Sequence, residues 1–216
     1  MVGLIVFVGK CLSSLSKFFH FGAGGTWPGE IALMLRPNIA LTLAKQLRKG
    51  VILIAGTNGK TTTSLMIKKI LEGQGNAVIH NTSGANLLNG IVSAFIVQSD
   101  WFGNVSADWG VFEIDENSLP IILQYVTPKT VVLLNLFRDQ LDRYGEVDVI
   151  VEKWQKALVK LPKDTEVVLN SDDPGVAWLG KSVKGKVTYF GMNDKSEFLK
   201  SAEHATDSTF CPNCGS

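Results

Sequence analysis

Short runs of apolar residues alternate along the chain with longer segments in which apolar positions recur every three or four residues. A short continuous apolar run is typical of a strand buried in a parallel sheet, and the longer spacing is typical of a helix with one apolar face. We therefore predict strands over residues 51–55, 77–81, 109–114, 130–135, 166–170 and 186–190. We predict helices over residues 60–72, 87–98, 116–126 and 147–161, and a short helix from residue 174. This alternation predicts an α/β fold with a doubly wound, mostly parallel sheet and helices on both faces.

The N-terminal segment is apolar up to Lys10, and residues 11–21 then mix apolar side chains with serines and Lys17. The uninterrupted run is shorter than the ~18 residues of a membrane span, and its lysines follow it, whereas a signal peptide carries them in front. The pattern favours a helix packed on the domain. The alternatives are a segment that lies against a membrane or a partner, and a signal or anchor. A turn-rich connector is expected over residues 22–30, and a helix from Pro37 to near Gly50.

The composition describes a globular chain of 216 residues, 45% apolar, with 21 basic and 20 acidic side chains and a net charge of +1. The apolar content excludes a disordered chain, and the near-zero charge argues against nucleic-acid binding through a basic surface. Three cysteines cannot form a disulfide framework, so we expect a reducing compartment. The length suits one large domain, or one domain with a short appendage. The 21 glycines exceed the usual share and point to phosphate loops and tight turns.

A glycine-rich loop, Gly-Thr-Asn-Gly-Lys-Thr-Thr-Thr at residues 56–63, follows the first predicted strand and opens a helix. This context is that of a phosphate-binding loop, so we expect ATP to bind here. Glycines let backbone N–H groups approach phosphate oxygens, and the helix N-terminus adds partial positive charge. The loop is a shorter variant of the general pattern, because Ala55 stands where the first glycine would be. The alternative interpretation is a helix cap with a chance Gly-Lys-Thr.

The residue types of this loop suit ATP and magnesium. Lys60 would supply positive charge to the β- and γ-phosphates and is a candidate catalytic residue. The hydroxyl of Thr61 is expected to bind Mg²⁺, and that of Thr62 a phosphate oxygen. The expected nucleotide-binding residues are Gly56, Thr57, Asn58, Gly59, Lys60, Thr61 and Thr62.

Further polar residues follow the other strands at the same edge of the predicted sheet, where ligands of such sheets bind. Glu113 ends an apolar strand, and its hard carboxylate suits Mg²⁺, although a strand-end salt bridge would also explain it. Asn135 follows the fourth strand. Residues Asn81, Ser83 and Asn86 follow the second strand, where they either line a substrate or only pack.

The loop and several later segments resemble the Mur ligase superfamily, whose members join an amine to a carboxylate through an acyl phosphate made from ATP. These segments are Asn-Thr-Ser-Gly-Ala-Asn-Leu-Leu-Asn-Gly at 81–90, Val-Phe-Glu-Ile-Asp-Glu at 111–116, Leu-Asn-Leu-Phe-Arg-Asp-Gln-Leu-Asp-Arg-Tyr-Gly-Glu at 134–146, and Leu-Asn-Ser-Asp-Asp-Pro at 169–174. Together they are similar to the MurT family, the ligase-like subunits of lipid II isoglutaminyl synthases. The resemblance runs from about residue 24 to the C-terminus and implies the fold of the Mur ligase central domain.

The resemblance implies roles for some residues and leaves others open. Lys60 and Thr61 would hold the phosphates and Mg²⁺, and Glu113 matches the superfamily glutamate that binds magnesium. Gln140 follows Asp139 where amino-acid-adding relatives usually have a histidine. This departure fits the MurT family and leaves a second magnesium site open.

Two further positions have both a family-based and a purely structural interpretation. Lys153 lies near the place where some relatives carry a carbamylated lysine, but a solvated helix lysine is the favoured interpretation. Asp172 and Asp173 precede Pro174 and are typical of a helix start, and a nucleotide role for them would be family analogy only.

Cys211 and Cys214 form a C-x-x-C turn, and MurT-like proteins carry a four-cysteine zinc ribbon in the central domain. We therefore expect the first half of a zinc site, with Zn²⁺ bound only if a second pair is present. Cys11 and His204 are poor further ligands, and a free two-cysteine turn is the alternative. The expected division is an N-terminal helix and connector over 1–49, an ATP-binding central domain over 50–200, and a truncated zinc ribbon over 201–216.

The implied function is that of an ATP-dependent carbon–nitrogen ligase in peptidoglycan synthesis. MurT-like enzymes activate the α-carboxylate of D-glutamate in the lipid II stem peptide as an acyl phosphate, and ammonia converts it into D-isoglutamine. The three cysteines lack a glutaminase setting, so a GatD-type glutaminase partner is implied, in a heterodimer. A cytoplasmic location is expected, with peripheral contact to the membrane that holds lipid II. The alternatives are an amino-acid-adding Mur or folylpolyglutamate ligase, and a nucleotide-binding module without activity.

Overall fold

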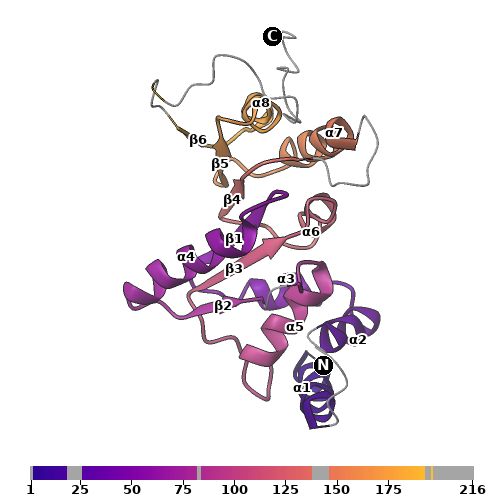
Figure 1. Ribbon diagram of the computed structural model, residues 1–216. Coiled ribbons are helices and arrows are strands. Elements are labelled where there is room, and N and C mark those ends of the chain that lie inside the picture. Colours follow the sequence, from indigo (N-terminus) through magenta and orange to yellow (C-terminus); the bar gives the residue numbers. More distant parts are fainter. Residues whose placement is uncertain (1, 19–25, 82–83, 138–145, 193–195, 197–216) are drawn as a thin grey trace.

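The computed structural model describes residues 2–18, 26–81, 84–137, 146–192 and 196. Its centre is a six-stranded sheet in the order β2-β3-β1-β4-β5-β6, in which every neighbouring pair is parallel (Figure 1). The strands are β1 (Gly50–Ala55), β2 (Val78–His80), β3 (Trp109–Ile114), β4 (Thr130–Leu133), β5 (Glu166–Asn170) and β6 (Val187–Phe190). The six predicted strands and the parallel α/β fold are confirmed.

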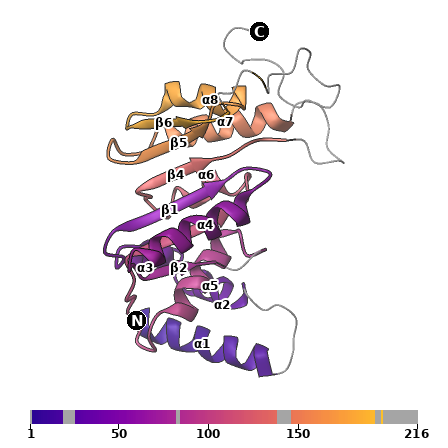
Figure 2. The same ribbon diagram turned by 60° about the vertical axis from the view of Figure 1, so that its left-hand side comes forward.

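Helices cover both faces of this sheet (Figures 1 and 2). One face carries α4 (Lys60–Gly73), and the other carries α5 (Leu88–Gln98), α6 (Leu119–Ile122), α7 (Glu146–Leu158) and α8 (Pro174–Trp178), which continues into the 3₁₀ turn η1 (Leu179–Ser182). The remaining helices are α1 (Val2–Phe18), α2 (Trp27–Leu35) and α3 (Ile39–Ala44). They contact α5, and α1 and α2 lie at the end of the molecule beyond β2 (Figure 2).

The core is divided in two because successive side chains of a strand point to opposite faces of the sheet. In β1, Val51 and Leu53 belong to the larger core, which α5 and α7 cover. Ile52 and Ile54 belong to a smaller core, against which Ile67 of α4 packs. A strand residue two positions from a member of one core therefore lies on the same face of the sheet as that member.

The segment expected to be a turn-rich connector over residues 22–30 is partly helical, because α2 begins at Trp27. Pro28 lies in the first turn, where its missing N–H costs nothing. Gly29 allows close contact with α5, since a Cβ atom there would collide with the backbone of Asn89, and its N–H donates to Ser93 Oγ (2.8 Å). Glycine and proline, read from the sequence as turn signals, thus start a helix and allow it to pack closely.

Two predicted helices are shorter in the structure. The helix after Pro37 ends at Ala44 instead of near Gly50, because the N–H groups of Arg48 and Lys49 bond to the segment that precedes β3. The helix predicted over 116–126 is only α6, because Asp115 accepts the N–H of residue 117 and turns the chain before the helix begins. Both ends are set by hydrogen bonds that an apolar pattern does not reveal.

The N-terminal helix α1 is packed on the domain, which was the favoured interpretation. Ile5 and Val6 are buried, and Lys10 Nζ donates to the carbonyl of Val97 (2.9 Å) while lying over the Trp101 ring. Of the helices in the described part of the chain, none is long and apolar enough to cross a membrane.

Candidate functional site

The loop between β1 and α4 has a positive φ at two glycines, a backbone conformation that other residues rarely adopt. Gly56 has φ +146° and Gly59 has φ +83°. A Cβ atom on Gly56 would lie 2.9 Å from Leu134 Cβ and 3.0 Å from the backbone nitrogen of Asn135. These glycines let the loop curve against the end of β4. The loop lines a hollow of about 280 Å³, whose wall is formed by Thr57, Asn58, Gly59, Lys60, Thr61 and Thr62.

Asn135 holds this loop in place from the end of β4. Its carbonyl accepts the N–H of Thr57 (2.8 Å), its Oδ1 accepts the N–H of Asn58 (2.9 Å), and its Nδ2 donates to the carbonyl of Asn58 (3.2 Å). The Thr57 hydroxyl accepts the N–H of Phe137 (3.0 Å). Asn135, expected at the ligand edge, therefore shapes the loop, and the hydroxyl of Thr57 is engaged with the backbone.

Lys60, at the start of α4, folds back over the loop. Its Nζ donates to the carbonyls of Gly56 (2.5 Å) and Thr57 (2.8 Å) and lies 3.5 Å from Glu116 Oε2. Both side chains of this ion pair are largely buried, with 15% and 17% exposed. The amino group of Lys60 therefore lies at the hollow, bound to oxygens of the protein. To bind a phosphate, it has to give up these contacts.

Glu116 was missed by the sequence analysis as a site residue. The third acid of the Phe-Glu-Ile-Asp-Glu run was a possible signal, but only the fold shows that it reaches Lys60. Its loop is fixed from α7, because the indole of the fully buried Trp154 donates to the Glu116 carbonyl (2.7 Å).

Glu113 is a buried carboxylate near the carboxyl end of β3. It is 2% exposed, and alternation along β3 places it on the same face as Val111, the face that α4 covers. Within the described part of the chain, its Oε2 is buried without a hydrogen-bond partner. An orphaned buried carboxylate oxygen is costly unless a ligand satisfies it. The oxygen donors of Glu113 and Thr61, on the same side of the sheet, fit a hard cation such as Mg²⁺. Among the described residues, Glu113 has no salt bridge.

Three other predicted residues have structural roles at this edge. Asn81 is buried and bonded to the backbone of Glu113, and the carbonyl of Asn86 accepts the N–H of Asp115 (3.0 Å). Asp173 caps α8 by accepting the N–H of Val176 (3.0 Å), which confirms the helix-start interpretation. The side chains of Asn81 and Asp173 and the backbone of Asn86 thus shape the edge of the sheet.

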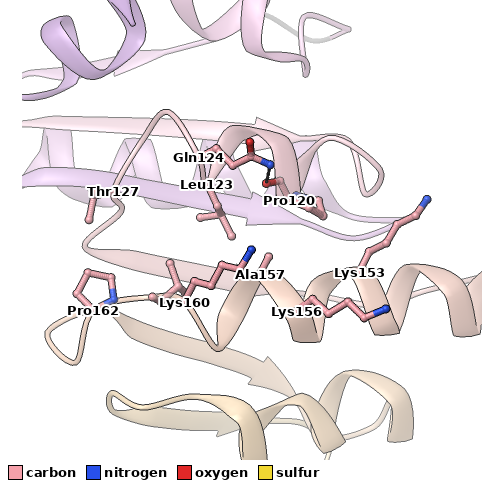
Figure 3. A pocket seen from close by; sticks show the side chains of 10 residues that line it. Pro120, Leu123, Gln124, Thr127, Lys153, Lys156, Ala157, Lys160 and Pro162 are labelled. Carbon is pink, nitrogen blue, oxygen red and sulfur yellow. Dashed lines mark hydrogen bonds between the residues drawn. The ribbon is translucent and has the colours of Figure 1, made fainter.

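Lys153 lies in a different hollow, of about 380 Å³, between α6 and α7 (Figure 3). It extends from α7, as Lys156 does, and the same hollow is lined by Leu123, Ala157 and Lys160, which follows the helix. Lys153 is not among the residues that line the phosphate-loop hollow. The solvated-lysine interpretation suits this position.

Several predicted residues lie outside the described residues, namely Ser83, Asp139, Gln140, His204, Cys211 and Cys214. The zinc half-site and the second magnesium site therefore stay predictions. Within the described ranges, no group of three or more His, Cys, Asp or Glu side chains could hold a metal ion, and Cys11 is an exposed free thiol.

The sequence is similar to known peptidoglycan enzymes. Residues 54–213 match the family model of the Mur ligase middle domain. The chain is 41% identical over 193 residues to the MurT subunit of a glutamine-hydrolysing lipid II isoglutaminyl synthase from Staphylococcus aureus strain COL. It is 34% identical over 195 residues to the corresponding subunit from Streptococcus pneumoniae strain R6. The alignments cover 89% and 90% of this chain but 42% of each relative, so the chain spans less than half the length of these proteins.

The fold is similar to that of a solved ligase, MurF from Thermotoga maritima in complex with ADP. The match covers 76% of this chain and 37% of that chain, with a TM-score of 0.63 and 17% sequence identity. At this identity the likeness shows the fold alone.

Proposed function

The chain belongs to the Mur ligase middle domain family, and from this premise we propose that it binds the phosphates of ATP with Mg²⁺ and activates a carboxylate. The observation that carries the proposal is the buried Glu113, whose unpartnered Oε2 lies on the sheet face covered by the phosphate-loop helix. In the proposed site, Glu113 and the hydroxyl of Thr61 hold the cation, which would neutralise charge on the transferred phosphoryl group.

The loop residues then act by electrostatics and positioning. The backbone N–H groups of residues 59–62, at the N-terminus of α4, face the phosphates, and Lys60 exchanges the carbonyls of Gly56 and Thr57 for phosphate oxygens. Because Asn135 fixes the loop before the nucleotide arrives, little reorganisation is needed.

The substrate we propose is the α-carboxylate of D-glutamate in the stem peptide of lipid II. A carboxylate oxygen attacks the γ-phosphorus of ATP and ADP leaves; ammonia then attacks the acyl carbon and phosphate leaves. The support is the similarity to two MurT subunits over about nine tenths of this chain. That similarity does not favour the amino-acid-adding alternative.

The partner we propose is a GatD-type glutaminase that supplies the ammonia, because the relatives are named as subunits of a glutamine-hydrolysing enzyme. A cytoplasmic location follows from a lipid II substrate. Peripheral membrane contact is proposed for α1, where Leu4 and Phe7 expose 68% and 49% of their surface.

The proposed arrangement of the chain has an ATP-binding central domain over 50–200, preceded by the helical segment and followed by the cysteine segment. Cys211 and Cys214 are proposed as two of the four thiolates of a zinc site, which a second pair would complete.

The decisive experiment is the amidation of lipid II by the protein and its glutaminase partner, with ATP and glutamine, followed by mass spectrometry of the stem peptide. The expected product carries an amide in place of the D-glutamate carboxyl. Lys60→Ala should abolish turnover, whereas Lys69→Ala, on the same helix but with its side chain 76% exposed, should not. Turnover by Lys60→Ala at the wild-type rate would refute the loop assignment, and unchanged stem peptide with the wild-type protein would refute the proposed reaction.

A further inference from the structure

The carboxyl end of β2 is hydrogen-bonded to both sides of the proposed magnesium site through two adjacent residues. Asn81 Oδ1 accepts the N–H of Glu113 (3.0 Å), and Asn81 Nδ2 donates to the Glu113 carbonyl (2.9 Å). His80 Nε2 lies 3.0 Å from Ser64 Oγ, which lies 3.0 Å from the carbonyl oxygen of Thr61. One dipeptide therefore reaches β3 at Glu113 and the first turn of α4 at Thr61.

The direction of the His80–Ser64 hydrogen bond follows from the number of protons. The Thr61 carbonyl can only accept, so the single hydroxyl proton of Ser64 is donated to it. His80 Nε2 must then donate to Ser64 Oγ, which fixes the imidazole in its Nε2–H form. Burial holds the pKa of His80 below its usual value, Lys68 lowers it further, and Glu113 and Glu72 oppose the shift.

The members of this chain have little freedom to move. Ser64 is the one buried residue of α4, and Asn81 is fully buried with its Nδ2 also bonded to the carbonyl of Ala85 (2.8 Å). The backbone of His80 is fixed from α5, where Gln98 Nε2 donates to its carbonyl (2.9 Å). Such over-determined placement is what Mg²⁺ demands, because it tolerates little departure from octahedral geometry.

We propose that His80 and Asn81 are positioning residues that fix Thr61 and Glu113 relative to each other, so that both can bind the same Mg²⁺. The inference rests on the proposed function, which makes Thr61 and Glu113 the magnesium ligands. His80 and Asn81 touch neither the nucleotide nor the cation in this arrangement. They act through Ser64 and through the backbone of Glu113.

The test separates magnesium-dependent from magnesium-independent nucleotide binding. The affinity of the protein for a non-hydrolysable ATP analogue is measured by calorimetry, once with MgCl₂ and once with EDTA. In His80→Leu, which keeps bulk but has no donor, the gain in affinity from Mg²⁺ should fall about fivefold while affinity in EDTA changes less than about twofold. His80→Gln, which can place an N–H near the position of Nε2, should restore the gain.

Matched variants show whether the path runs through Ser64. Ser64→Ala removes only the hydroxyl oxygen that accepts from His80, and it should lower the gain in affinity from Mg²⁺ as much as His80→Leu does. The double variant should lower this gain no further than either single variant. Asn81→Ala, which removes both bonds to Glu113, should also lower the gain. Gln155→Ala is the control, since it removes a side-chain hydrogen bond to Ser182 that involves neither β2 nor α4, and it should leave the gain unchanged. Thermal unfolding confirms that each variant folds.

Two outcomes overturn the inference separately from the proposed function. If the wild-type protein gains affinity from Mg²⁺ and His80→Leu and Ser64→Ala gain as much, His80 does not position the site. If these variants lost the same nucleotide affinity with Mg²⁺ as with EDTA, His80 would likewise have only a structural role. If the wild-type protein itself gains nothing from Mg²⁺, the magnesium site fails, and the positioning role fails with it.

Discussion

The face of the sheet that α5, α6 and α7 cover holds most of the buried apolar side chains, whereas the face that α4 covers holds a small apolar core and the proposed chemistry. On the α4 face, the polar Ser64 and Glu113 are buried. On its outer side, α4 exposes Leu65, Met66 and Ile70. The same strands thus present an apolar packing surface on one side and a polar site on the other.

The difference follows from the two-residue period of a strand and has a thermodynamic meaning. Phe112 and Glu113 are neighbours in β3, yet Phe112 packs in the larger core and Glu113 faces α4. Burial of apolar surface stabilises the fold, while a buried carboxylate oxygen without a partner costs stability. We therefore expect substitutions on the two faces to affect activity and stability separately.

The largest expected effect is that of Glu113→Gln on activity. Loss of the carboxylate should lower the rate of ATP-dependent amidation by about 10³-fold. In the proposed site, this carboxylate holds the Mg²⁺ that neutralises charge on the transferred phosphoryl group. Stability without Mg²⁺ should stay equal or rise by up to about 1 kcal/mol, because the unsatisfied charge is gone. Steady-state rates measure the effect on amidation, and urea unfolding measures the effect on stability. Glu72→Gln on α4 is the control, and a near-wild-type rate for Glu113→Gln would contradict the comparison.

On the opposite face, Phe112→Ala should destabilise the fold by about 3–5 kcal/mol. The ring is fully buried, and its centroid lies 5.2 Å from that of Phe95. The milder Phe112→Leu should cost less than about 1.5 kcal/mol and leave the affinity for MgATP unchanged. Urea unfolding and calorimetry measure these quantities. If Phe112→Leu weakened nucleotide binding as Glu113→Gln does, the two faces would not be separable.

Elements with a strong local pattern could be predicted from the sequence. Each strand is a short apolar run, and the phosphate loop is recognisable because Gly56 and Gly59 supply backbone conformations that other residues avoid. The position of Glu113 near the carboxyl end of β3 could be predicted because it ends an apolar run. These features depend on neighbouring residues alone.

Features that depend on contacts distant in the sequence could not be predicted. Glu116 meets Lys60 across 56 positions, and His80 meets Ser64 across a helix and a turn. The helix α2 was missed because its glycine contacts α5, which no local pattern shows. Asn81 and Asn135 were placed at the correct edge, but their bonds to backbone groups emerged only with the fold.

A smaller effect is expected for Asp173→Ala, at the ligand edge but outside the proposed chemistry. Asp173 caps α8 and also accepts the N–H of Leu136 (2.8 Å), so its loss should cost about 1–2 kcal/mol. Asp173→Asn keeps an acceptor and should cost less. Thermal unfolding measures the loss, and the affinity for MgATP should not change. A selective loss of MgATP affinity at unchanged stability would show instead that this edge residue belongs to the site.

The smallest effect on stability is expected at Glu166 of β5. Alternation with Val168 places it on the sheet face that α4 covers, but outside the part that α4 itself covers. Its Oε1 lies 2.6 Å from Lys186 Nζ and accepts the hydroxyl of Thr188 (2.8 Å), and these bonds, Lys186 first, hold the pKa of Glu166 below its usual value. A lowered pKa in the folded state stabilises the fold above the unfolded-state pKa, and that contribution is lost as the pH falls through the folded-state pKa.

Glu166→Gln should therefore lower stability at pH 7 by no more than about 0.5 kcal/mol, because the pair is exposed and screened by solvent. The difference between the two proteins should shrink as the pH falls below about 4.3, the usual glutamate pKa, and should also shrink in high salt. Urea midpoints of both proteins at pH 7 and at acid pH measure it. A difference that grew on acidification would contradict the sign. A small effect here, beside a large one at Glu113, would show that the chemistry of the α4 face is confined to the part that α4 covers.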